Sequence, residues 1–214
     1  MTIKAAAFDM DGLMFDTEDT YWKAASALLG RRGEVYTGEL CNAVMGRPPK
    51  VCFELFKETF GFSESCQELQ RESEDFFLEF LDGGFSAMPG LYELLEHLEQ
   101  RNIPKGICTS SSIRVVSEVL RRKDMPKRFA FVLTAEDIIH GKPDPEIYLK
   151  AAARFSIAPP EMLVLEDSTA GCQAAHRAGA FGIAVRAKHN AHCEFPDAKK
   201  IVSRLDDLQI MELF

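Results

Sequence analysis

Residues 8–18 read FDMDGLMFDTE, a stretch rich in side chains that can do acid–base or metal chemistry. Its carboxylates are Asp9, Asp11, Asp16 and Glu18. Two carboxylates about 4 Å apart repel each other by roughly 4 kcal/mol at an effective dielectric constant near 20. A fold therefore keeps such a cluster only where a cation balances it or where the charges diverge into water.

Two more carboxylates, Glu166 and Asp167, lie at the end of an apolar run at residues 162–166, and Asp9 follows a similar run at residues 3–8. Both runs have the composition of buried strands. In a doubly wound parallel sheet, ligands bind beyond the carboxyl ends of the strands. Asp9, Glu166 and Asp167 would supply hard oxygen ligands there, a set that suits Mg²⁺ held together with substrate phosphate oxygens. Such a cation would also balance the repulsion among the carboxylates.

Three other residues at the same predicted edge favour an anion. Thr109 offers a hydroxyl, Ser110 offers a backbone N–H near the start of a helix, and Lys142 is a point charge suited to a phosphate oxygen. A carboxylate that attacks phosphorus forms an aspartyl-phosphate. A second acid two residues later could protonate the leaving oxygen and then deprotonate water. Each residue alone could be a helix cap or a solvated loop residue, but their joint occurrence after these strands favours phosphoryl transfer.

The elements that must position these residues alternate between strands and helices. The predicted strands are residues 3–8, 105–109, 130–134, 162–166 and 182–185. Helical periodicity is found at residues 91–101, 113–123, 144–155 and 168–178. This alternation predicts an α/β fold, a doubly wound parallel sheet with helices on both faces.

One segment interrupts the alternation with helical patterns alone. The predicted helices within it are residues 21–29, 51–60 and 66–81. The chain returns to the sheet through Gly83-Gly84, which are good turn residues. We therefore expect a core domain of residues 1–16 and 84–214 and an inserted, all-helical cap domain of residues 17–83. Asp16 or Thr17 is expected to cap the first cap helix.

Four segments carry a resemblance to a known family. They are FDMDGLMFDTE, the Thr109-Ser110 step, GKPDPEIY and LEDSTAGCQAA. Together they resemble the four motifs of the haloacid dehalogenase superfamily, and the resemblance covers essentially the whole chain. Within that superfamily the chain is similar to the small-capped group that includes β-phosphoglucomutase, sugar phosphatases and pseudouridine-5′-phosphatase. The resemblance implies a Rossmann-like core with a helical cap.

The resemblance also implies roles for the site residues. Asp9 falls at the position of the nucleophile, and Asp11 at that of the general acid/base, which also gives its backbone carbonyl to Mg²⁺. Thr109 and Lys142 fall where the family binds the transferring phosphoryl group. Asp167 falls at a direct metal ligand, and Glu166 at a ligand that acts directly or through water.

The presence of Asp11 points to phosphoryl transfer, because a dehalogenase of this fold needs neither an acid/base there nor Mg²⁺. We expect a Mg²⁺-dependent phosphatase of a small phosphorylated metabolite, a sugar phosphate or nucleoside monophosphate. Arg47, on a predicted cap turn, is a candidate substrate contact, with an ordinary exposed arginine as the alternative.

Two other functions stay open. A hexose-phosphate mutase is disfavoured because Tyr21 stands where the mutase has a histidine, and residues 45–49, MGRPP, replace its polar run. A receiver-like signalling domain also uses a phosphorylated Asp, acidic Mg²⁺ residues and a Lys. It lacks both a large cap insert and an acid two residues after the acceptor.

The composition fits a small-molecule enzyme. The 214 residues are 46% hydrophobic with a formal charge of −8 and a pI near 5.2, so neither a nucleic-acid surface nor a membrane span is indicated. The six cysteines form no CxxC pair, which indicates reduced thiols and a cytoplasmic protein. We expect a monomer. His189, His192 and Cys193 are expected to lie in an exposed polar loop.

Overall fold

The computed structural model describes residues 2–125 and 127–214. Its centre is a six-stranded parallel sheet with the strand order β3-β2-β1-β4-β5-β6. The strands are β1 (Ala5–Phe8), β2 (Lys105–Cys108), β3 (Phe131–Leu133), β4 (Met162–Glu166), β5 (Phe181–Val185) and β6 (Lys200–Val202). All residues of β1, β2 and β4 are buried, as expected for parallel strands covered on both faces.

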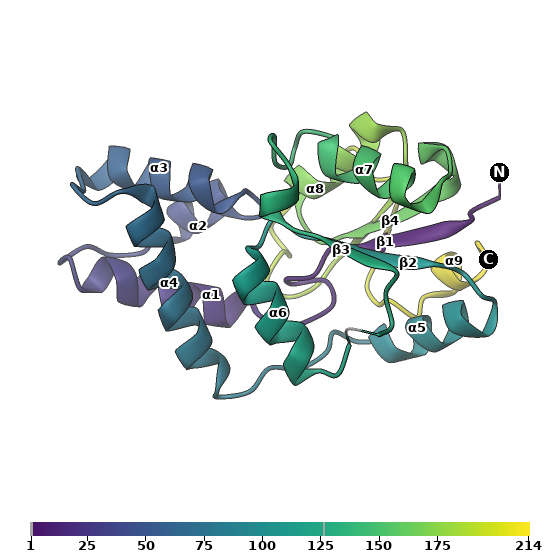
Figure 1. Cartoon of the computed structure of the whole chain (residues 1–214), viewed down its shortest axis with the longest axis horizontal. Coiled ribbons are helices and arrows are strands. Elements are labelled where there is room, and N and C mark those ends of the chain that lie inside the picture. Colours follow the sequence, from purple (N-terminus) through teal and green to yellow (C-terminus); the bar gives the residue numbers. More distant parts are fainter. Residues whose placement is uncertain (1, 126) are drawn as a thin grey trace.

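Helices cover both faces of the sheet (Figure 1). The helices α7 (Glu146–Phe155) and α8 (Thr169–Ala178) pack on one face. The other face carries α5 (Leu91–Gln100), α6 (Ile113–Arg122) and α9 (Leu208–Met211). The fold class predicted from the alternating pattern is therefore confirmed.

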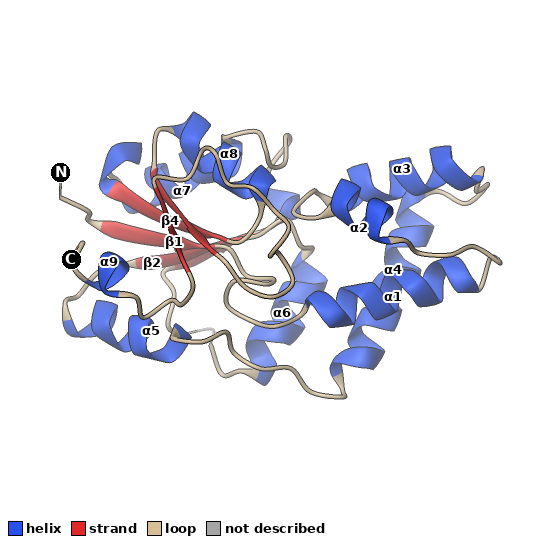
Figure 2. Ribbon diagram, turned by 180° about the vertical axis from the view of Figure 1, so that it is seen from behind, coloured by secondary structure: helices blue, strands red, loops and turns tan. Residues whose placement is uncertain are grey.

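Four helices lie beside the sheet rather than on it (Figure 2). They are α1 (Glu18–Gly30), α2 (Gly38–Val44), α3 (Pro49–Phe60) and α4 (Cys66–Leu81). They share an apolar cluster that includes Leu28, Phe53, Phe56 and Leu69. We refer to residues 17–83 as the cap segment. This separate apolar cluster supports the proposal that residues 1–16 and 84–214 form one domain and the cap segment another.

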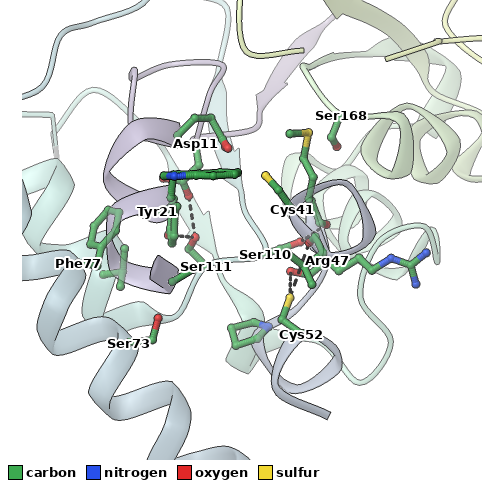
Figure 3. Close-up of a pocket in the computed structure, with 18 of the residues that line it drawn as sticks. Asp11, Tyr21, Cys41, Arg47, Cys52, Ser73, Phe77, Ser110, Ser111 and Ser168 are labelled. Carbon is green, nitrogen blue, oxygen red and sulfur yellow. Dashed lines mark hydrogen bonds between the residues drawn. The ribbon is translucent and has the colours of Figure 1, made fainter. Parts of the chain in front are cut away.

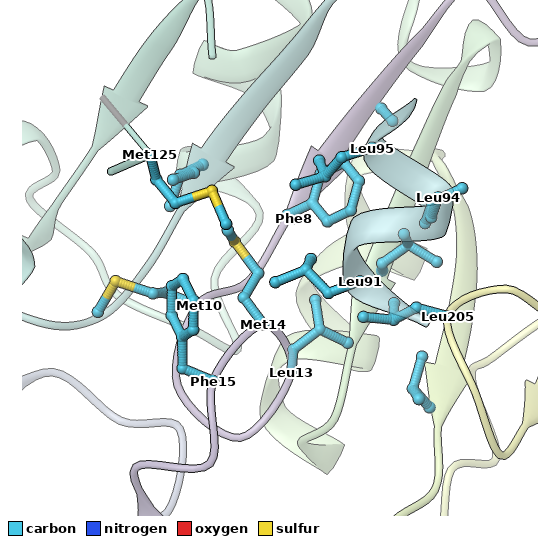
Figure 4. Packing of buried hydrophobic residues seen from close by; sticks show 14 of the residues in the cluster. Phe8, Met10, Leu13, Met14, Phe15, Leu91, Leu94, Leu95, Met125 and Leu205 are labelled. Carbon is cyan, nitrogen blue, oxygen red and sulfur yellow. The ribbon is translucent and has the colours of Figure 1, made fainter. Parts of the chain in front are cut away.

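The loop after β1 is anchored by apolar side chains on one side. Met10, Leu13, Met14 and Phe15 are completely buried, and Figure 4 shows Leu13 and Met14 beside Phe8 and Leu91. These apolar contacts anchor the loop that carries Asp9 and Asp11.

Some predicted boundaries differ from those observed. The helix expected to begin at Asp144 begins at Glu146, and Asp144 accepts a hydrogen bond from the Glu146 backbone N–H at 2.9 Å. Gly30, expected after the first cap helix, is its last residue, and Gly33 at φ +76° makes the turn. The helix α2 and the strand β6 have no counterpart among the predicted elements. In the described part of the chain, every helix is too short or too polar to cross a lipid bilayer.

Candidate active site

The sheet register brings the predicted site residues to one edge. Phe8 of β1 lies opposite both Ile107 of β2 and Leu165 of β4. Asp9 therefore follows directly beside Glu166 and close to Thr109. This is the juxtaposition expected from the strand order, because the carboxyl ends of parallel strands meet at the same edge.

A buried lysine joins two of the carboxylates. The Nζ atom of Lys142 lies 2.5 Å from Asp9 Oδ1 and 2.6 Å from Glu166 Oε1, and it donates a hydrogen bond to the Cys108 carbonyl oxygen at 3.0 Å. Burial alone would lower the pKa of Lys142, but the attraction of Asp9 and Glu166 outweighs it and raises this pKa. The lysine is therefore held as a cation between two acids.

Asp9, Glu166 and Asp167 form a compact buried trio, with one carboxylate oxygen from each within 4.8 Å of the others. Burial raises the pKa of Asp9 well above its ordinary value, Lys142 opposes this rise, and the other two carboxylates add to it. Burial also raises the pKa of Asp167 well above its ordinary value, and repulsion by Glu166 raises it further. Three acids with one lysine carry excess negative charge, which a divalent cation would balance.

Glu166 is held at both oxygens. Oε1 accepts from the Tyr148 hydroxyl at 2.5 Å as well as from Lys142, and Oε2 accepts from the Ser168 hydroxyl at 3.1 Å. A Cβ atom at Gly171 would lie 1.9 Å from the Glu166 carboxyl carbon, so only glycine leaves room for this side chain. These contacts fix Glu166 and, through it, the lysine.

Asp11 lies in a separate hydrogen-bond network (Figure 3). Its Oδ1 accepts from the Thr17 hydroxyl at 2.7 Å, and its Oδ2 accepts from the Ser111 hydroxyl at 2.6 Å. Ser111 also shares a 2.7 Å hydrogen bond with the Tyr21 hydroxyl of α1. Burial raises the pKa of Asp11, and the bonds from Ser111 and Thr17 oppose the rise. A raised pKa suits a group that must hold a proton for transfer.

The prediction for the start of the first cap helix is wrong at the side-chain level. Thr17 occupies the N-cap position of α1 but makes no capping hydrogen bond, because its hydroxyl is used by Asp11. Asp16 is exposed. Thr17, which was expected to cap the helix, therefore links the cap segment to Asp11.

Thr109 and Ser110 lie at the predicted edge, after β2. Thr109 is buried, and its hydroxyl accepts a hydrogen bond from the Ser111 backbone N–H at 3.0 Å. The Ser110 hydroxyl donates to the Gly46 carbonyl oxygen of the cap segment at 3.0 Å. The Ser110 side chain therefore contacts the cap segment, a contact that the sequence did not indicate.

Two site residues were missed from the sequence. His189 Nε2 lies 2.7 Å from Asp167 Oδ2, and the buried Asn190 side chain donates to the Asp167 carbonyl at 2.8 Å and the Val185 carbonyl at 3.0 Å. The prediction of an exposed loop is therefore wrong for His189, whereas His192 is exposed. The loop folds back because Asn190 satisfies backbone carbonyls at the strand ends. The sequence did hold one signal for this placement, because the loop with His189 and Asn190 follows β5 of the same parallel sheet.

A cavity of about 540 Å³ lies between this edge and the cap segment. Asp9, Asp11 and Asp167 line its core side. Arg47, the candidate substrate contact, lies on its cap side and is exposed. The volume is within the range of small-molecule sites.

Lys142→Met is expected to lower the free energy of unfolding by about 3 kcal/mol, because it leaves buried carboxylates without their cation. Urea unfolding in Mg²⁺-free buffer measures this. The matched control is Lys150→Met, which removes a lysine of 44% side-chain exposure paired with Glu146, and should cost no more than about 0.5 kcal/mol. Equal losses in the two variants would contradict the assigned role of the buried lysine.

The sequence of this chain matches a known protein family over most of its length. A sequence model described as "Haloacid dehalogenase-like hydrolase" matches residues 6–185, a range that contains every predicted site residue. The chain belongs to the haloacid dehalogenase-like hydrolase family. The resemblance stated from the four motifs is thereby confirmed.

Individual relatives agree with this assignment. A phosphorylated carbohydrates phosphatase of Thermotoga maritima is 33% identical over 83% of this chain and 82% of that protein. A probable pseudouridine-5′-phosphatase of Drosophila melanogaster is 33% identical over 80% of this chain and 77% of that protein. A β-phosphoglucomutase of Clostridium difficile has a similar fold, with a TM-score of 0.84, 24% identity, and coverage of 99% of this chain and 97% of that chain.

This haloacid dehalogenase-like protein is thus an enzyme, and the expected class, a phosphoric monoester hydrolase, is confirmed at the level of the family. The receiver-like alternative is set aside because the family is one of hydrolases. The roles of the individual residues stay predictions.

Proposed function

We propose that this hydrolase is a Mg²⁺-dependent phosphatase of a small phosphorylated metabolite, a sugar phosphate or a nucleoside monophosphate. We further propose that it acts through an aspartyl-phosphate on Asp9. The observation that carries the proposal is the arrangement of the two acids. Asp9 lies among buried carboxylates beside Lys142, whereas Asp11 lies in a separate network at the same cavity.

The donor set fits Mg²⁺. Asp9, Glu166 and Asp167 offer clustered carboxylate oxygens, the ligand type that this cation prefers. Together with the backbone carbonyl of Asp11, these residues would hold the ion. When bound, Mg²⁺ supplies positive charge that neutralises the phosphoryl oxygens and the carboxylates.

In the first proposed step, a carboxylate oxygen of Asp9 attacks phosphorus and the bond between phosphorus and the ester oxygen breaks. Asp11 donates its proton to that oxygen, so the alcohol leaves uncharged. The Thr109 hydroxyl and the Ser110 backbone N–H bind the transferring oxygens, and Lys142, held beside Asp9, supplies positive charge to the nucleophile and the phosphoryl group. These contacts act mostly by positioning and by electrostatic stabilisation.

In the second step, Asp11 is a carboxylate and takes a proton from water. The water oxygen attacks phosphorus, and the bond between phosphorus and Asp9 breaks. Inorganic phosphate leaves, Asp9 is again a free carboxylate, and Asp11 is again protonated. The same acid therefore serves both steps with its proton restored.

Hydrolysis is favoured over the mutase alternative by the residues around the cavity. A mutase must bind a bisphosphate intermediate and therefore hold a second phosphate. Among the described residues that line the cavity, Arg47 is the only arginine or lysine, and it is exposed. The phosphatases among the relatives support the same choice.

The purified protein should hydrolyse p-nitrophenyl phosphate with Mg²⁺ and lose this activity when EDTA is added. Restoring excess Mg²⁺ should restore the rate, which separates metal removal from denaturation. The release of p-nitrophenolate, followed by its absorbance, measures both effects. Activity that is unchanged by EDTA would argue against the metal assignment, and absence of any activity with Mg²⁺ would argue against the phosphatase.

A further inference from the structure

The cap side of the cavity is lined by aromatic side chains. The rings of Trp22 and Tyr36 pack with centroids 4.9 Å apart, and Tyr36 packs edge-on against Phe56 at 6.1 Å. Tyr36, Phe53 and Phe56 are buried in the cap's own apolar cluster, so they form a fixed floor. Trp22 stands on that floor with 40% of its surface exposed.

The Trp22 indole is exposed and available for contact with a ligand. It lines the cavity that also contains Asp9 and Asp11, so a bound substrate could cover it. Across the cavity, Figure 3 shows Phe77 and Ser73 of α4 opposite Cys52. The space beyond the acids is therefore bounded by aromatic side chains together with polar groups.

The polar groups on the cap side are not suited to a second anion. Glu18, Glu74, Gln70 and Ser73 line the cavity and offer carboxyl, amide and hydroxyl groups. Arg47 is exposed and is the only arginine or lysine among the described lining residues. A second phosphate would be buried near carboxyl groups without a buried counter-ion, which is unfavourable. Uncharged polar substituents would find hydrogen-bond partners.

We propose that this cavity selects phosphomonoesters whose alcohol carries an uncharged aromatic or heteroaromatic ring, and that the ring stacks on Trp22. This inference rests on the proposed function, since it assigns the leaving group of that reaction. With the phosphoryl group at Asp9, the ester oxygen lies on the side of Asp11 and the ring extends into the cap segment. A nucleoside 5′-monophosphate has this construction, whereas glycerol 3-phosphate lacks the ring and fructose 1,6-bisphosphate carries a second phosphate.

The test compares kcat/KM of the Mg²⁺-loaded enzyme for uridine 5′-monophosphate, glycerol 3-phosphate and fructose 1,6-bisphosphate. The nucleotide should have the highest value. Trp22→Leu keeps apolar volume but loses the flat face, and should lower the ratio of nucleotide to glycerol 3-phosphate about tenfold. Trp22→Phe keeps a ring and should lower it less.

A matched control and a failure criterion accompany this test. Tyr92→Leu removes an aromatic ring of similar exposure, 41%, on α5 outside the cavity, and should leave the ratio unchanged. An unchanged ratio in Trp22→Leu would overturn the inference. Similar kcat/KM values of the wild type for all three esters would also overturn it, but would leave the proposed phosphatase function standing.

Binding without turnover gives an independent measurement. Trp22 is the single tryptophan of the chain, so its fluorescence reports on the cavity alone. In the Asp9→Asn variant with Mg²⁺, uridine 5′-monophosphate should change this fluorescence saturably, and glycerol 3-phosphate should not. If no ester is hydrolysed by the wild type, the proposed function fails. The titration then decides the inference by itself, and the lack of a saturable change would overturn it.

Discussion

Asp9→Asn is expected to lower the rate of phosphomonoester hydrolysis by about 10⁴-fold or more. The amide has nearly the same shape as the carboxylate but cannot attack phosphorus, so the covalent step is lost rather than slowed. The Asp9 carboxylate is buried and lies 2.5 Å from the Lys142 ammonium group. Steady-state kinetics with p-nitrophenyl phosphate and Mg²⁺ measure the loss.

The matched control is Asp16→Asn, in the same acidic stretch. Asp16 is exposed, so this variant should keep a rate close to that of the wild type. Thermal unfolding of Asp9→Asn would show whether the fold is intact. A folded Asp9→Asn variant with wild-type turnover would rule out this residue as the nucleophile.

Asp11→Asn is expected to lower turnover by about 10²- to 10⁴-fold, the usual range for loss of a general acid or base. The backbone carbonyl is unchanged, so Mg²⁺ dependence should persist. Asparagine can still accept a hydrogen bond from one of the Thr17 and Ser111 hydroxyls with its amide oxygen and donate to the other with its amide N–H, so both contacts can persist. The loss should therefore lie in proton transfer rather than in substrate binding, and it should appear as a large fall in kcat.

The choice of leaving group separates the two proposed roles of Asp11, general acid in the first step and general base in the second. An alkyl alcohol needs a proton to leave, whereas p-nitrophenolate does not, so alkyl phosphates should lose more activity in the first step. With p-nitrophenyl phosphate, Asp11→Asn should give a rapid burst of p-nitrophenolate equal to the enzyme concentration, then slow turnover. The wild type should show a faster steady state that masks the burst. Equal losses for alkyl and aryl esters, with no burst, would contradict the acid/base assignment.

Much of the site could be predicted because it depends on the order of strands. Asp9, Thr109 and Glu166 each follow or end a short apolar run, and parallel strands end at one edge of the sheet. Lys142 reaches the same edge through a loop, and its sequence context resembles the family motif. The placements of Asp9, Thr109 and Glu166 need only local pattern and topology, whereas that of Lys142 rests on the resemblance.

Other elements left no such pattern. The helix α2 has no buried residue, so it has no apolar face for periodicity to reveal. The strand β6 is three residues long and has Ile201 exposed, which removes the signal of a buried strand. Both elements form because the neighbouring structure holds them.

The contacts of single side chains could not be predicted for a different reason. His189 meets Asp167, and Tyr21 meets Ser111, across long stretches of sequence. Such contacts depend on how loops fold back and how the cap segment lies against the core, not on local composition. The role of Thr17 could not be predicted for the same reason. Its hydroxyl donates a hydrogen bond to Asp11 and does not cap α1.

The central claim, a covalent phosphoryl group on Asp9, is tested most directly by trapping it. Asp11→Asn with p-nitrophenyl phosphate and Mg²⁺ should accumulate the phosphoenzyme, because its hydrolysis needs the missing base. Acid quenching and borohydride reduction convert an aspartyl-phosphate to homoserine, and peptide mass spectrometry locates it. We expect homoserine at position 9 in close to one copy per enzyme, and none when the substrate is omitted. Homoserine at another aspartate, or unmodified Asp9 after a full burst, would contradict the mechanism.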